Sequence, residues 1–256
     1  MQFGYSAMPA YCRAAQEAGY DYVELPGKVV AAMSAKEFTT FAATLNIPAF
    51  GINAFCPAEV VLTGPKHDLA VVCDYTEKLS KRAANLGVKT VGIGSPMSRN
   101  LPKEFDRELA KTQLENSLIE IANILGKNDI TACLEALAAC YCNTVNTLEE
   151  AAEIVRRLQH PNLNIVLDFY NMEHMGEADV DLTGIPFIHA HISDDDGAPN
   201  LRSYLKPEKR EIHQKRIGSL VKQGYGGGIT LEVDVAFDPF RAKESLCIMQ
   251  EACTYL

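Results

Sequence analysis

Short apolar runs alternate with amphipathic stretches along the whole chain. The runs hold four to eight residues, as buried strands do, whereas the amphipathic stretches repeat apolar residues every three or four positions, as helices do. The runs predicted to be strands are 2–6, 22–25, 49–55, 90–94, 130–137, 164–169, 187–193 and 229–235. The helices predicted between them are 9–18, 34–45, 67–86, 103–125, 147–158, 212–223 and a last one from 239.

Local start signals support the helices. Ser34 with Glu37, and Thr147 with Glu150, have the spacing of capping boxes. Strict alternation of strand and helix indicates a parallel sheet, and eight repeats indicate closure into an α/β barrel. We therefore predict a single (β/α)8 TIM barrel domain over residues 1–256, with a doubly wound open sheet as the alternative.

The seventh predicted strand carries two histidines. His189 and His191 are two residues apart, so both imidazoles point to the same face of the strand. Burying an unpaired polar group costs roughly 2 to 7 kcal/mol, so each ring needs a partner. A metal ion would satisfy them, and so would backbone carbonyl groups.

The last four predicted strands each carry a possible ligand near the carboxyl end. These residues are Glu135, Asp168, His191 and Glu232. Strand ends meet at one mouth of a barrel, so we expect the four side chains to converge there, although separate salt bridges at the rim are the alternative. Three carboxylates and one imidazole suit Mn²⁺, Mg²⁺ or Co²⁺ better than a structural zinc. We predict one divalent metal ion, Mn²⁺ before Mg²⁺, Co²⁺ or Zn²⁺.

Charge and hydropathy narrow the choice of partners. The net charge is −9 and no run of Lys and Arg exceeds two residues, which argues against nucleic acid and for a small-molecule partner. No segment approaches the roughly 18 apolar residues of a membrane helix, and the first residues do not resemble a signal peptide. We expect a cytoplasmic protein without a membrane partner. Barrels often self-associate, so a homo-oligomer is compatible with the sequence.

At the level of motifs the chain resembles the xylose-isomerase-like barrels of sugar isomerases and epimerases. That group includes tagatose 3-epimerases, hydroxypyruvate isomerases and inosose dehydratases. The similar segments are 19–24, 83–92 and the four strand ends. The resemblance implies that the four metal ligands of the family correspond to Glu135, Asp168, His191 and Glu232.

The resemblance also implies a mechanism. A metal ion would chelate the carbonyl and a neighbouring hydroxyl of a sugar-like keto compound and stabilise its cis-enediolate. Glu135 and Glu232 would act as acid and base on opposite faces of the substrate. This mechanism describes an isomerase or epimerase.

The chain departs from the family pattern at three positions. Asn171 stands where the epimerases have a histidine, and His174 lies one helical turn further on. Gly197 stands where the family has an arginine, so we expect Arg202 to reach back into the site. Tyr141 replaces a second glutamate. These differences favour a related reaction, such as the loss of water, as an alternative to simple 3-epimerisation.

Further polar residues are predicted to face the mouth. The predicted substrate-binding residues are Glu24, Asn53, Asn171, His174, His189 and Arg202. The main alternative function is a metal-dependent lyase of the inosose or dehydroshikimate dehydratase type. A non-catalytic sugar-binding barrel is a further alternative, and the acidic balance argues against a phosphodiesterase of abasic DNA.

Overall fold

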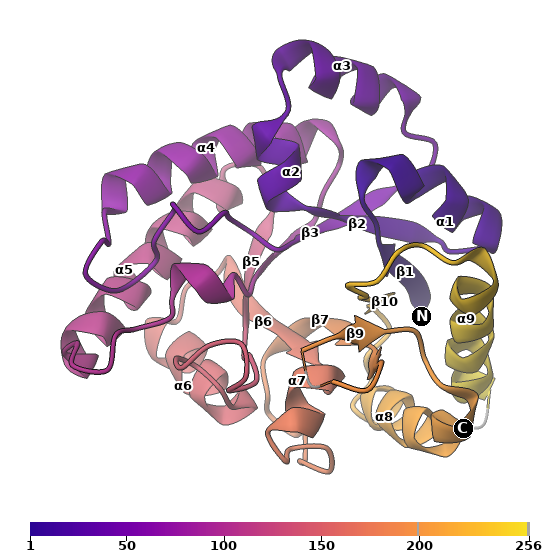
Figure 1. Ribbon diagram of the computed structural model, residues 1–256. Helices are drawn as coiled ribbons and strands as arrows, with labels where there is room; N and C mark the ends of the chain where they lie inside the picture. Colours follow the sequence, from indigo (N-terminus) through magenta and orange to yellow (C-terminus); the bar gives the residue numbers. More distant parts are fainter. Residues whose placement is uncertain (199, 255–256) are drawn as a thin grey trace.

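The computed structural model describes residues 1–198 and 200–254, and within them eight parallel strands form a closed barrel (Figure 1). Around the barrel the strands follow the order β1-β10-β7-β6-β5-β4-β3-β2. Their bounds are β1 (Gln2–Ser6), β2 (Tyr22–Pro26), β3 (Ala49–Asn53), β4 (Thr90–Ile93), β5 (Thr131–Glu135), β6 (Leu163–Asp168), β7 (Phe187–Ile192) and β10 (Gly228–Leu231). The predicted (β/α)8 TIM barrel is confirmed.

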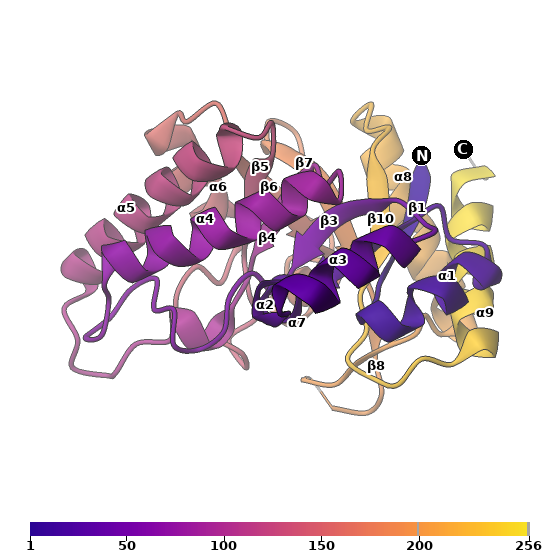
Figure 2. The ribbon, with the colours of Figure 1, turned by 90° about the horizontal axis from the view of Figure 1, so that it is seen from above.

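Helices surround the barrel, and α9 lies beside α1, where it covers the seam between the first and last strands (Figures 1 and 2). The α-helices are α1 (Cys12–Ala18), α2 (Gly27–Ala32), α3 (Ala35–Thr44), α4 (Leu69–Asn85), α5 (Arg107–Gly126), α6 (Leu148–Leu158), α7 (Phe169–His174), α8 (Arg210–Lys222) and α9 (Pro239–Thr254). Short 3₁₀ turns are η1 (Pro9–Tyr11), η2 (Pro96–Ser98) and η3 (Pro207–Lys209). Of the helices described, none is long and apolar enough to cross a membrane.

Both predicted capping boxes form, at the starts of α3 and α6. The start predicted at residue 103 for the helix observed as α5 was wrong, because Asp106 caps α5 by accepting from the backbone N–H groups of Glu108 and Leu109. The last predicted strand was too long, since β10 ends at Leu231. The N–H of Glu232 still donates to the carbonyl of Ile192, at 3.2 Å.

Apart from α7 and the 3₁₀ turns, two features of the fold were not predicted. The first is α2, which begins directly after Pro26 without a polar cap. The second is a small antiparallel hairpin of β8 (Asp194–Asp195) and β9 (Arg202–Ser203), which follows β7. We call it the β8–β9 hairpin.

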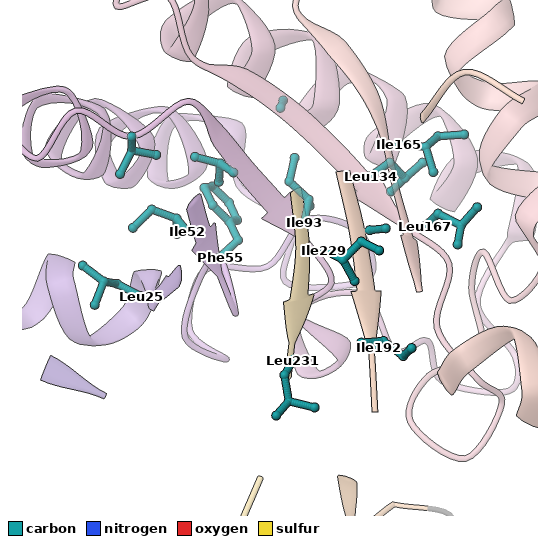
Figure 3. Close-up of a cluster of buried hydrophobic side chains, with 14 of the residues drawn as sticks. Leu25, Ile52, Phe55, Ile93, Leu134, Ile165, Leu167, Ile192, Ile229 and Leu231 are labelled. Carbon is teal, nitrogen blue, oxygen red and sulfur yellow. The ribbon is translucent and has the colours of Figure 1, made fainter. Parts of the chain in front are cut away.

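The two faces of the barrel wall differ in chemistry. Apolar side chains on the outward face form the core, and Figure 3 shows Leu25, Leu134, Ile192 and Leu231 among them. Alternate positions on the same strands carry polar side chains that point inward. The wall therefore holds the fold together on one face and presents the candidate site on the other.

The ring of Tyr22 fills the amino-terminal end of the barrel. Its hydroxyl lies 3.0 Å from Oγ1 of Thr230, within hydrogen-bond distance. Two glycines make room for the ring, because a Cβ added at Gly4 would lie 2.0 Å from Tyr22 Cε2, and one added at Gly228 would lie 2.4 Å from the hydroxyl. Neither distance is compatible with a side chain larger than hydrogen.

We predict that Gly4→Ala destabilises the protein by about 1–3 kcal/mol, because the added methyl group must displace a packed aromatic ring. Denaturant unfolding followed by circular dichroism measures the change. Gly226→Ala is the matched control, since a Cβ at that position meets nothing within 4 Å. Equal stability of the two variants would contradict this account of the barrel floor.

Candidate metal centre

The four predicted ligands converge at the carboxyl ends of their strands. Glu135 and Asp168 end β5 and β6, His191 lies next to the end of β7, and Glu232 follows β10. One ligand atom from each lies within 4.8 Å of the other three. We call these four residues the four-ligand cluster. The four side chains thus converge at one mouth of the barrel, as predicted from their positions at the strand ends.

The cluster is buried except at one side. Glu135, Asp168 and His191 are buried, whereas the side chain of Glu232 is 17 % exposed. Glu232 lines a cavity of about 240 Å³, together with Tyr5, Ser6, Asn53, Asp234 and Phe237. A small molecule would therefore reach the cluster from the side of Glu232.

His191 connects the cluster to a carboxylate below it. Its Nε2 donates to Oε2 of Glu24, at 3.1 Å. Its Nδ1 lies 3.2 Å from a Glu232 oxygen and 3.7 Å from an Asp168 oxygen. This buried Nδ1 has no hydrogen-bond partner among the residues described. One nitrogen is thus fixed by a carboxylate while the other faces the ligand oxygens, an arrangement common for metal-binding histidines.

Glu24 and His189 lie beneath the cluster. Glu24 accepts hydrogen bonds from His189 and from Oγ1 of Thr230, the latter at 2.5 Å. Burial would raise the pKa of Glu24, but His189 and His191 outweigh burial and hold that pKa well below its usual range. Both residues were predicted to bind substrate, yet neither lines the cavity. Their observed contacts orient His191.

The three carboxylates of the cluster differ in acidity. Burial first, and then the charges of Glu232 and Asp168, raise the pKa of Glu135 to about 8. For Asp168 burial also acts upward, but Arg202 and His191 lower its pKa below the usual range. The pKa of Glu232 is lowered in the same way, against burial, by Arg202 and His191.

Arg202 lies within the cluster. Its Nη1 donates to Asp168 Oδ2 at 2.7 Å and also to Glu232, while Nη2 is 3.6 Å from Oε1 of Glu135. The residue is 5 % exposed, and its guanidinium lies 4.9 Å from the centre of the Tyr170 ring. The predicted reach of Arg202 into the site is therefore observed, but its partners are the ligand carboxylates themselves.

Asn171 and His174 lie on α7, directly after Asp168. The backbone N–H of Asn171 donates to Oδ1 of Asp168 at 2.8 Å, and its Nδ2 donates to Oε1 of Glu135 at 3.0 Å. Asn171 is buried, so its contacts fix two ligands. His174 is half-buried and packs edge-on against Tyr170 at 4.5 Å, outside the four-ligand cluster. Substrate binding by these two residues stays a prediction.

Asn53 is the predicted substrate-binding residue that borders the cavity most directly. Its Nδ2 donates to Ser6 Oγ at 2.6 Å and to Glu232 Oε1 at 3.0 Å. Its buried Oδ1 has no hydrogen-bond partner among the residues described. Asn53 thus holds Glu232 in place and presents an acceptor for a hydroxyl group.

Sequence reasoning missed two supports of the site. Thr230 lies two residues before Glu232, so the period of a strand would have placed it on the inward face. Asp194 anchors the β8–β9 hairpin by accepting from His213 at 2.9 Å and from the N–H of Lys206 at 2.7 Å. Nothing local in the sequence indicates the pairing of Asp194 with His213.

Comparison with known proteins agrees with the barrel fold. The profile of the family described as xylose isomerase-like TIM barrel matches residues 12–244, so the chain belongs to that family. A putative hydroxypyruvate isomerase from Xenopus laevis is 28% identical over 101 residues, which is 37% of this chain and 36% of that protein. The match thus spans about a third of the relative's length.

Solved structures share the fold over the whole chain. The apo form of 3-keto-D-glucoside 4-epimerase from E. coli superposes with a TM-score of 0.76 at 17% identity, covering 98% of this chain and 99% of that one. The IOLI protein, solved with a bound zinc atom, superposes with a TM-score of 0.69 at 19% identity, covering 100% of this chain and 97% of that one.

We predict that the stability of the metal-free protein depends on pH through Glu135. The folded carboxyl group keeps its proton up to about pH 8, whereas the unfolded one loses it near its ordinary value of 4.5. The folded state therefore holds more protons in this range, and Glu135 makes stability fall as pH rises, by at most about 1.4 kcal/mol per pH unit.

Glu135→Gln replaces the titrating carboxyl group with a neutral amide. The stability of this variant should therefore fall less steeply between pH 4.5 and about pH 8 than that of the wild type. Thermal melts in a chelator at a series of pH values measure the difference, with the exposed Glu104→Gln as control. Parallel curves for wild type and Glu135→Gln would show that burial does not hold a proton on Glu135.

Proposed function

We propose that this protein is a divalent-metal-dependent isomerase or epimerase that acts on a sugar or a sugar-like keto compound. The observation that carries the proposal is the approach of the four ligand atoms to within 4.8 Å of one another at the barrel mouth. Membership of the xylose isomerase-like family supports it. The likeness to a solved sugar epimerase is consistent with it.

The residues present fit a metal ion. The set offers one imidazole and three carboxylates, and the buried Nδ1 of His191 lacks any other partner among the described residues. Oxygen-rich sets of this kind suit Mn²⁺, Mg²⁺ or Co²⁺, and the zinc atom reported in the IOLI protein keeps Zn²⁺ among the candidates. Our first choice is Mn²⁺. A bound divalent ion supplies Lewis-acid polarisation of a substrate carbonyl.

Two carboxylates of the chain would carry out the proton transfer, one as base and the other as acid. Glu135 and Glu232 come from β5 and β10, which are separated by β6 and β7 in the barrel wall. One carboxylate would remove the proton from the carbon next to the carbonyl, and the other would return a proton to that carbon or its neighbour. Glu232 lines the cavity and is held by Asn53, so it can meet the substrate directly.

The cavity fits a small polar substrate. Its volume of about 240 Å³ lies below the range typical of drug-sized ligands. Ser6 and Asn53 offer hydroxyl and amide groups to substrate hydroxyls, and Phe237 offers an apolar wall. These features agree with a short sugar or keto-polyol.

We predict that the protein, dialysed against Mn²⁺ and then against metal-free buffer, retains close to one ion per chain. Asp168→Asn should retain much less Mn²⁺, because the variant replaces one of the three carboxylate ligands of the four-ligand cluster with a neutral amide. Elemental analysis by mass spectrometry measures the content, with the exposed Asp179→Asn as control. Absence of metal from both wild type and control would sink the proposed metal site.

We predict that Glu232→Gln slows turnover by roughly 10²- to 10⁴-fold, the usual contribution of a positioned acid or base. Proton NMR in D₂O over a panel of ketoses and cyclic ketones follows exchange at carbon, with the exposed Glu208→Gln as control. Near-native turnover by Glu232→Gln would remove it from the mechanism. An unsaturated product from the wild type would identify a lyase instead of an isomerase.

A further inference from the structure

A positive side chain already lies among the ligands. Nη1 of Arg202 contacts Asp168 Oδ2 and Glu232 Oε2 together, and Nη2 faces Glu135. A divalent ion bonded to those same two oxygens would lie roughly 2.0–2.6 Å from each, in the space that Nη1 now fills. The guanidinium and an ion therefore cannot both occupy the space between these two oxygens.

The backbone of Arg202 is held from several sides. In the β8–β9 hairpin Asp195 pairs with Arg202, and the carbonyl of Arg202 accepts from the N–H of Asp234 at 3.1 Å. Arg241 donates to the hydroxyl of Ser203, at 2.9 Å. With its backbone fixed, the guanidinium can move only by rotation of the side chain. The ring of Tyr170, whose centre is 4.9 Å away, makes a cation–π contact with the guanidinium in its present position.

We propose that Arg202 is the built-in counter-cation of the metal-free site, and that a divalent ion binds only by displacing its guanidinium from the carboxylates. This inference rests on the proposed metal-dependent function and adds a competition to it. Glu135, Asp168 and Glu232 would repel one another in the buried site if both cations were absent. Arg202 thus stabilises the metal-free protein and, for the same reason, weakens the apparent affinity for metal.

The competition has opposite effects on two measurable quantities. In the wild type only the molecules whose carboxylates are free of the guanidinium can bind Mn²⁺. In Arg202→Ala every molecule is in that state, so the apparent affinity for Mn²⁺ rises by the inverse of the fraction that was free in the wild type. The metal-free protein loses its counter-charge and becomes less stable. A ligand that binds only the folded state then raises the melting temperature further in the variant than in the wild type.

The test compares Mn²⁺ binding and thermal unfolding of the full chain in wild type, Arg202→Ala and Arg202→Lys. Arg13→Ala is the control, because it removes one exposed cation whose partner is Glu17 on α1, away from the hairpin and the cluster. We expect Arg202→Ala to bind Mn²⁺ roughly tenfold more tightly or better, and to melt at a lower temperature without metal. Arg13→Ala should keep the wild-type affinity. Arg202→Lys keeps the positive charge, so it serves as the test variant if Arg202→Ala does not fold. Its affinity for Mn²⁺ should lie between those of the wild type and Arg202→Ala.

Added guanidinium ion tests whether the guanidinium group blocks the metal site by occupying it, or whether any positive charge lowers Mn²⁺ affinity. Millimolar guanidinium chloride should weaken Mn²⁺ binding to Arg202→Ala more than potassium chloride at the same ionic strength does. The wild type, whose site is filled by its own side chain, should respond equally to both salts. Equal responses of the alanine variant to the two salts would overturn occupancy by the guanidinium.

The remaining outcomes distinguish this inference from the proposed function. Wild-type or weaker affinity in Arg202→Ala, with Mn²⁺ still bound, overturns the competition and leaves the metal site intact. Binding by Arg202→Ala but not by the wild type supports the competition and overturns the metal dependence proposed for the wild-type protein. Absence of binding in every protein overturns the metal site, and the inference with it.

Discussion

Three carboxylates held side by side impose the constraint on which this molecule depends. Glu135 and Asp168 are buried at the ends of strands whose other face packs into the apolar core, so neither can turn into water without disturbing that packing, and Glu232 is open only to the extent of 17 %, where it lines the cavity. Their mutual repulsion must be met by a proton, a cationic side chain or a metal ion. The positions of Arg202 and His191 and the raised pKa of Glu135 all respond to this one requirement.

Much of the fold could be predicted because its signals are local. The capping boxes at Ser34 and Thr147 involve residues three apart, and the apolar alternation of each strand is visible within a few positions. The elements that escaped prediction lack such signals. Helix α2 begins directly after Pro26 without a polar cap, and each strand of the β8–β9 hairpin has only two residues.

In the candidate site, too, some residues could be predicted from local sequence patterns and others could not. The strand ends indicate the four ligands, because in a barrel each end must meet the others at one mouth. The partners of those ligands come from distant parts of the chain. Glu24 is 165 residues from His189, and Asn53 is 179 residues from Glu232, so no local pattern could have paired them. Whether Arg202 contacts substrate or ligand depends on side-chain conformation, which periodicity does not report.

The barrel seam gives the site a further property. Strand β1 closes the barrel by pairing with β10, and Ser6 and Glu232, which stand at the ends of these two strands, both contact Asn53 on β3. Asn53 thus links the end of β1 to the residue that follows β10, whereas the four ligands all lie on β5, β6, β7 and directly after β10, on one side of the seam. Closure of the barrel therefore fixes the position of Glu232 through Asn53, while the other three ligands are placed by strands that pair with one another without β1.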